Sequence, residues 1–195
     1  MKMLAALIVV AVLASWALWM QMRPQSAPQN LPAWSSFESA EVRDISISGA
    51  GFPLTHLQQQ GKHWLLLDGE ANGAEKHGVA ANDEAVNHLL ASLADMRLVR
   101  VVTHHAEHFP RLGLDEATGI HVVLRDKHGS ILLDILVGKP AVDLISTYVR
   151  RQGVNEAVTV NRSLSWQLKR THDTWQAPPE SPEPALGAAG SGDLP

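Results

Sequence analysis

Cysteine is absent from the 195 residues of this sequence. Disulfide bonds, thiolate zinc sites, iron–sulfur clusters and cysteine nucleophiles are therefore excluded. Net charge is also low, because 16 basic and 20 acidic residues give a formal charge of -4 at pH 7. Nucleic-acid binding depends on clustered lysine and arginine side chains that contact phosphates, so we expect no nucleic-acid partner.

A phosphate-binding loop is missing too, although the segment LVGKP contains Gly138 and Lys139. Such a loop requires a glycine five residues before the Gly-Lys pair and a serine or threonine after it. Leu133 and Pro140 occupy these positions. We therefore interpret the segment as a turn after a strand.

A long apolar run occupies residues 3–22, MLAALIVVAVLASWALWMQM, with Ser15 and Gln21 as its polar interruptions. A helix of about 20 apolar residues spans a hydrocarbon core of roughly 30 Å. The alternative is a cleaved signal peptide, whose apolar region usually has about 7 to 15 residues and ends in a small-residue site such as A-x-A. We predict an uncleaved transmembrane anchor over residues 1–23.

Leu4, Trp16 and Trp19 are the expected anchor residues, and the two tryptophans lie near the end of the span, where aromatic rings favour the headgroup zone. The amino terminus and Lys2 lie on one side of the span and Arg23 on the other. The positive-inside rule then favours a cytoplasmic N-terminus. In a bacterium this predicts a single-pass inner-membrane protein with a periplasmic domain.

Composition divides the rest of the chain into three parts. Residues 24–39 are rich in proline and small polar residues, which predicts a semi-rigid linker. Residues 177–195 hold few large apolar side chains, so we expect a disordered tail. One α+β domain is expected between them, over residues 40–176.

Hydrophobic periodicity predicts the elements of this domain. Alternation indicates strands in the segments DISIS, FPLTHLQQ, HWLLL, IHVVL, ILLDILV, STYVRR and EAVTV. Asn82 is a good N-cap for a first helix, whose apolar stripe consists of Val86, Leu89, Leu90, Leu93 and Met96. A second helix should close the domain, with Leu164, Leu168 and Trp175 on one side. The predicted fold is an antiparallel sheet with two amphipathic helices packed on it, preceded by the transmembrane helix.

Several segments, taken in order, resemble a bacterial family named domain of unknown function 4340, which is related to domains in auxiliary proteins of gliding-motility ABC transporters. The resemblance covers about residues 40–175 and rests on ISISGAGFPLTHLQQQGKHWLLL, SLADMRLVRVV, RLGLD, IHVVLRDKHGSILLDILVGK and STYVRRQGVNEAVTVNRSLSWQLKR. It implies a membrane-tethered extracytoplasmic module, often associated with ABC-type transport machinery. It implies no catalytic residues, and this chain has one such unit where longer members have more.

The segment VVTHHAEHFPRLGL concentrates His104, His105 and His108. On a helix, histidines four residues apart share one face, where neutral imidazole binds zinc or copper. However, β-branched residues precede the cluster and Pro110 follows it, which favours a strand end that runs into a loop. The order H-H-x-E-H also differs from the H-E-x-x-H of zinc proteases. We expect a polar connector without a cofactor, and a metal site at the three histidines is the alternative.

Arg97, Arg100 and Arg111 lie around these histidines. Such a patch would suit lipid headgroups or an acidic partner, while a solvated face is the simpler interpretation. Trp64 and Trp166 are expected in the core or over the sheet, because large aromatic side chains dominate core burial.

Three functions are compatible with these observations. The first is a non-catalytic, membrane-anchored domain that docks an envelope or ABC-transporter-type protein. The second is a glycan- or lipid-binding periplasmic module, and the third is a metal-dependent enzyme built on the histidine cluster. We expect the first, with the bilayer and a membrane or envelope protein as partners.

Overall fold

A computed structural model describes residues 31–49, 51–67 and 78–178. The predicted anchor, with Leu4, Trp16 and Trp19, and nearly all of the predicted tail lie outside these residues. Among the helices that are described, none is long and apolar enough to cross a membrane.

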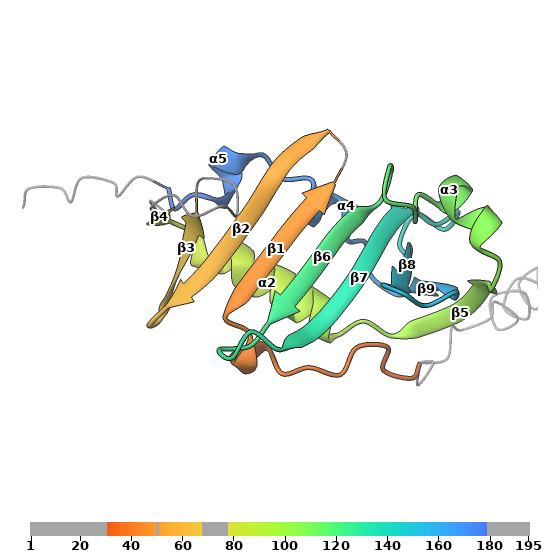
Figure 1. Ribbon diagram of the computed structural model, residues 1–195, viewed down its shortest axis with the longest axis horizontal. Helices are drawn as coiled ribbons and strands as arrows, with labels where there is room; N and C mark the ends of the chain where they lie inside the picture. The colour runs from red at the N-terminus through yellow and green to blue at the C-terminus, as the bar shows by residue number, and fades with distance from the viewer. Residues whose placement is uncertain (1–30, 50, 68–77, 179–195) are drawn as a thin grey trace, which may run out of the picture. The chain divides into compact units, whose positions relative to one another are not determined.

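The described residues form one antiparallel sheet of nine strands in the order β4-β3-β2-β1-β6-β7-β8-β9-β5 (Figure 1). The strands are β1 (Asp44–Gly49), β2 (Phe52–Gln60), β3 (His63–Leu67), β4 (Gly78–Ala80), β5 (Leu98–Thr103), β6 (Ile120–Arg125), β7 (Ile131–Pro140), β8 (Thr147–Arg151) and β9 (Ala157–Val160). All seven predicted strands are confirmed. The expected turn at Gly138 is wrong, because β7 continues to Pro140.

Helix α2 (Asp83–Ala94) packs behind the sheet in Figure 1, as its apolar stripe predicts. The Asn82 side chain accepts a hydrogen bond from the Ala85 amide at 3.0 Å, which confirms the expected N-cap. Asp83 accepts another from the Trp64 amide at 2.8 Å and so ties the helix to β3. The face of the sheet that α2 covers is called the inner face below.

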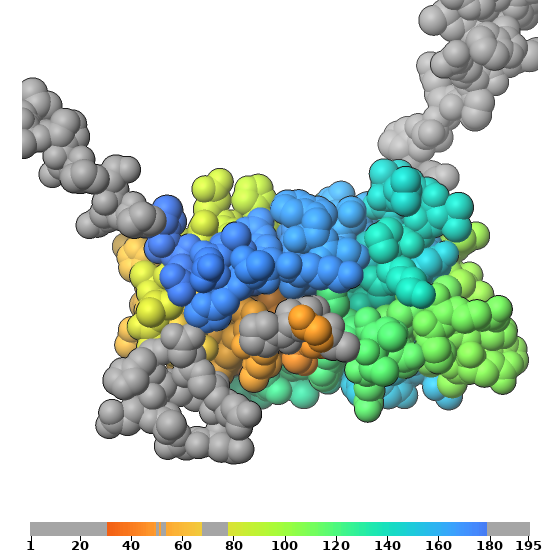
Figure 2. Space-filling view, turned by 90° about the horizontal axis from the view of Figure 1, so that it is seen from above, coloured from red at the N-terminus to blue at the C-terminus, as the bar shows by residue number. Residues whose placement is uncertain are grey.

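The prediction of one closing helix is wrong. Two four-residue helices take its place, α4 (Ser165–Leu168) and α5 (His172–Trp175). Helix α4 packs against β7, whereas the carbonyl of Trp175 accepts a hydrogen bond from the Asn82 amide beside β4. Three residues, 169–171, separate the two helices, and Thr171 among them is extended. The chain runs along the domain between these places, as the blue segment in Figure 2 shows.

Two tryptophan predictions have different outcomes. Trp64 is 3% exposed and lies in the core, as expected. Trp166 is 61% exposed, so its predicted burial is wrong. The guanidinium of Arg170 lies 5.5 Å from the Trp166 ring centre and 5.4 Å from that of the buried Trp175. A cation–π contact therefore takes the place of core packing for Trp166.

A small second cluster lies on the outer face, opposite α2. It forms where η2 (Ala106–His108) and α3 (Phe109–Leu112) follow β5, and its buried members are Phe109, Leu114, Leu136 and Ala157. Gly113 ends α3 with a φ of 71°, which favours glycine. A Cβ on Gly138 of β7 would lie 2.3 Å from the Leu112 carbonyl oxygen, so glycine lets this turn approach the strand closely.

Candidate functional site

The outer face is open across β2, β1 and β6. Alternation directs Ile45 and Ile47 of β1 into the inner core. Strand register then groups polar side chains on the other side, and we call the group Asp44, Ser46, His56, Gln58 and Arg125 the open face. No helix among the described residues lies in front of these three strands in Figure 1.

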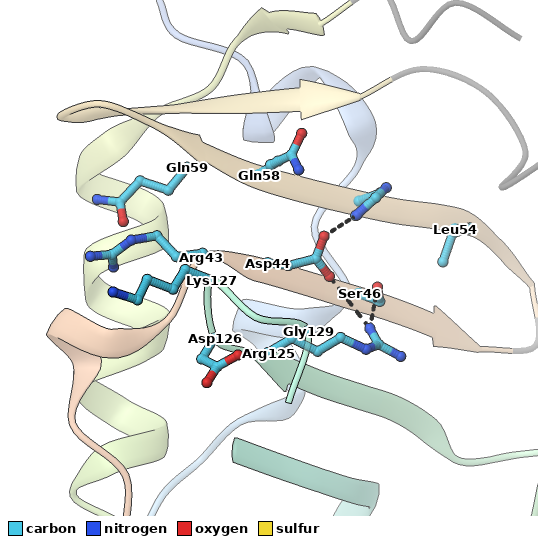
Figure 3. Close-up of a pocket in the computed structure, with 11 residues that line it drawn as sticks. Arg43, Asp44, Ser46, Leu54, Gln58, Gln59, Arg125, Asp126, Lys127 and Gly129 are labelled. Atoms are coloured by element: carbon cyan, nitrogen blue, oxygen red, sulfur yellow. Dashed lines mark hydrogen bonds and ion pairs between the residues drawn. The ribbon is translucent and has the colours of Figure 1, made fainter. Parts of the chain in front are cut away.

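An ion-pair network occupies the centre of the open face (Figure 3). His56 Nε2 lies 2.5 Å from Asp44 Oδ2. Arg125 Nη1 lies 3.4 Å from the other carboxylate oxygen of Asp44 and 3.5 Å from Ser46 Oγ. The side chains of Asp44 and His56 are only 19% and 16% exposed, so the pair is largely withdrawn from water.

The pKa of Asp44 lies below its ordinary value of 3.8. Burial alone would raise it, since desolvation disfavours a carboxylate. The hydrogen bond and charge of His56, together with Arg125, outweigh that effect and favour the ionised form. Asp44 is therefore a fixed negative charge at neutral pH.

The network resembles part of a catalytic triad, because a carboxylate holds one imidazole nitrogen. Activation of a hydroxyl nucleophile requires a base that accepts its proton. Ser46 Oγ instead accepts from the Arg125 guanidinium, a cation that cannot take a proton. These contacts hold the charged groups of the network in position.

A pocket of about 600 Å³ lies over the open face, a volume typical of small-molecule sites. Leu54, Arg43 and Lys127 complete its rim (Figure 3). Asp126 also borders it, but its carboxylate accepts the amides of His128 and Ser130 at 2.8 Å within the β6–β7 turn. Arg43 and Lys127 are therefore the main charged groups that face solvent at this end of the pocket.

A second pair continues the polar surface on β6 and β7. His121 Nε2 lies 2.7 Å from Asp134 Oδ1, with side chains 36% and 28% exposed. Next to it is a smaller pocket of about 340 Å³, to which Ser48, Glu116 and Gln152 contribute. Two histidine–carboxylate pairs thus lie on one face of the sheet.

The predicted histidine cluster follows β5, which confirms the expected strand end. The expected loop is wrong from Ala106 onward, because the short helices η2 and α3 form there and Pro110 lies in the first turn of α3. His108 Nδ1 lies 3.1 Å from Thr103 Oγ1, and the rings of His105 and His108 meet edge to face at 5.7 Å. His104 lies 3.8 Å from Glu156. Across the described ranges, no three histidine or acidic side chains are grouped as a metal site requires.

The three arginines of the predicted patch have different contacts. Arg97 donates to Asp95 at 3.2 Å. Arg100 acts electrostatically on Asp143 of the β7–β8 connection, and the carbonyl of Arg111 accepts from Lys139 Nζ at 3.1 Å. Arg100 thus acts on the β7–β8 connection, the main chain of Arg111 contacts β7, and Arg97 has a local partner.

Sequence reasoning missed the open face. Its only local signal is the DISIS alternation, which places Asp44 and Ser46 opposite the isoleucines. The pairing of β1 with β6 brings Arg125 to Asp44 across 81 positions of sequence, and no short-range pattern indicates that contact.

Comparison with known proteins finds a family match. No curated protein and no solved structure matches the chain. The model of the family described as Domain of unknown function (DUF4340) matches residues 64–179, which begin at the second residue of β3. Because this match covers more than half of the sequence, the chain belongs to the DUF4340 family.

Proposed function

We propose that this chain is a membrane-tethered, non-catalytic binding domain whose open face docks a protein partner of the cell envelope. The observation that carries the proposal is the contrast between a fully packed inner face and an outer face of ordered, ion-paired charges. Charged groups already held in place lose little freedom on binding and favour a partner of complementary charge.

The tether is part of the proposal and rests on the apolar segment at residues 3–22. The charges around it favour a periplasmic domain in a bacterium. A reporter fused after Pro195 tests the orientation. A fusion that is active only in the cytoplasm would contradict it.

Photo-crosslinking in intact membranes tests the docking face. A photoreactive amino acid at Gln58, exposed on the open face, should capture one protein in stoichiometric yield. The matched control is Asn87, which is exposed on α2 at the opposite side of the domain. Equal capture at both positions, or none at either, would reject the open face as the docking surface.

A small polar ligand is the second candidate, favoured by the pocket of about 600 Å³. Arg125, His56 and Gln58 supply donors of the kind that fix hydroxyl and carboxylate groups. A glycan array with the full chain in detergent tests it. Binding that is abolished by Arg125→Ala and retained by Asn87→Ala would support a ligand site on the open face.

A further inference from the structure

The connection between β7 and β8, residues 141–146, exposes three large apolar side chains. Val142 is 89% exposed, Leu144 75% and Ile145 71%. In Figure 2 the teal region that contains this connection forms one corner of the domain, beside the blue segment that leads into α4. We call residues 141–146 the apolar loop. Contiguous apolar exposure of this kind marks a contact site.

The apolar loop is ordered by its own hydrogen bonds. The Asp143 carboxylate accepts from the amides of Ile145 and Ser146 at 3.1 and 2.8 Å, and from Ser146 Oγ at 2.7 Å. The Ala141 amide donates to the Ser146 carbonyl at 2.8 Å. These bonds satisfy the single carboxylate of the loop while the apolar side chains point outward.

Leu144 has a φ of 62°, in the left-handed region that leucine rarely adopts. This strain brings no core packing, because the side chain is exposed. Neither the left-handed backbone of Leu144 nor its exposed apolar side chain stabilises the fold. Such outliers persist where function requires them.

The apolar loop lies at the end of the sheet where the chain enters the domain. Leu98 pairs with Val160, and Val160 pairs with Thr147, which directly follows the loop. Leu98 and Thr147 are therefore two strand spacings apart, about 10 Å. The Leu98 amide donates to the Pro32 carbonyl at 2.9 Å, so Pro32 is fixed in the same region.

Eight residues, 24–31, separate the predicted anchor from Pro32. Fully extended, they span at most about 30 Å. A domain tethered this closely keeps the end that carries Pro32 near the bilayer surface. Basic groups belong to the same region, since Lys139 lies two residues before the loop and Arg100 acts on Asp143. Such groups suit anionic headgroups.

We propose that the apolar loop inserts into the headgroup region of the bilayer that holds the anchor, so that Val142, Leu144 and Ile145 form a second membrane contact. The inference rests on the membrane tether of the proposed function. A lipid surface accommodates a small convex apolar tip, whereas a protein interface needs roughly 800 Å² on each partner. Insertion would also orient the open face at a defined angle to the membrane.

Spin labelling of the full chain tests this proposal directly. Because the sequence has no cysteine, Ile145→Cys and Ile131→Cys each create a single labelling site. Ile131 is a matched control, since it is 58% exposed and begins the ten-residue strand that leads to the loop, roughly 30 Å away. For each nitroxide, the collision rate with oxygen is compared with the collision rate with a water-soluble nickel chelate. The chain is held in phosphatidylcholine–phosphatidylglycerol vesicles.

The label at residue 145 should collide with oxygen and be shielded from nickel, while the label at residue 131 should remain in water. Leu144→Asn in the chain labelled at residue 145 should lower the ratio of inserted to free loop about tenfold or more. This is the factor that burial of one leucine side chain contributes. Leu144→Phe keeps a large apolar group and should preserve insertion. Asparagine tolerates the left-handed backbone, so folding should survive the substitution.

Equal nickel access at residues 145 and 131 in a chain that stays bound to vesicles would overturn the loop proposal alone. Release of the whole chain by alkaline carbonate would contradict the tether, and the loop proposal with it. Protection of residue 145 in native membranes but not in pure lipid would assign the loop to a protein partner and overturn the lipid contact.

Discussion

The two faces of the sheet use alternate residues of the same strands for opposite purposes. On the inner face, Ile45, Ile47 and Leu57 are fully buried under α2. On the outer face, their neighbours Asp44 and His56 are partly exposed and held as an ion pair. Apolar burial is the dominant favourable term in folding, whereas partly exposed ion pairs add little. The inner face therefore stabilises the fold, and the outer face holds charged side chains at fixed positions.

The outer face is itself divided. Over β7 and β8 it is covered by α3 and carries the small cluster around Phe109. Arg150 closes that cluster, with its guanidinium 5.0 Å from the Phe109 ring and its Nε donating to the Leu114 carbonyl at 2.8 Å. Cover by α3 leaves β2, β1 and β6, with the part of β7 that carries Asp134, as the surface available for binding.

Among the substitutions considered, Leu89→Ala should lower the free energy of unfolding most, because Leu89 is fully buried in the inner core. Loss of its side chain leaves a cavity that costs about 2–5 kcal/mol of the free energy of unfolding. Denaturant unfolding measures this value, and Asn87→Ala on the exposed side of α2 is the control. A loss no larger than that of the control would refute the assignment of stability to the inner face.

Gly138→Ala should destabilise the covered part of the outer face. Its Cβ would lie 2.3 Å from the Leu112 carbonyl, so α3 must shift away from β7. Overpacking of this kind costs about 1–3 kcal/mol. Thermal unfolding gives the loss, and hydrogen exchange should show it concentrated in residues 109–114. An unchanged Tm would mean that α3 does not depend on this close approach.

Asp44→Asn should reduce stability by about 1.5 kcal/mol at neutral pH, since it weakens charged hydrogen bonds to His56 and Arg125. The pKa of Asp44 is lowered in the folded chain, so its contribution is complete above the ordinary value of 3.8 and is lost as the pH falls through the lower folded value. The stability difference between wild type and variant should therefore shrink below pH 3.8. A difference that is constant from pH 7 to the acid transition would contradict this pairing.

Gln58→Ala should have the smallest effect on folding, within about 0.5 kcal/mol, because the side chain is exposed. It should nevertheless weaken partner capture if the open face is the docking surface. Crosslinking yield and denaturant unfolding, measured on the same preparation, separate the two effects. If Gln58→Ala lowers the free energy of unfolding without any change in capture, the assignment of binding to the outer face is contradicted.

Local patterns predicted most of the elements correctly. The Asn82 cap and the stripe of α2 depend on residues within a few turns, and strand alternation depends on nearest neighbours. The prediction of one closing helix was wrong because the apolar spacing at Leu164, Leu168 and Trp175 also fits two short helices joined by three residues. Exposure of Trp166 could not be foreseen, since it depends on where Arg170 lies.

The sequence by itself determined the antiparallel α+β class, the family and the absence of cysteine chemistry, because periodicity, motif order and composition are properties of the chain alone. Tertiary structure decided which residues form a site. The open face exists because β1 lies between β2 and β6, and the apolar loop is notable because a left-handed Leu144 remains exposed. The open face depends on contacts between distant segments, whose formation is governed by packing of the whole domain. The apolar loop is ordered by its own hydrogen bonds, and its exposure depends on where the rest of the domain packs.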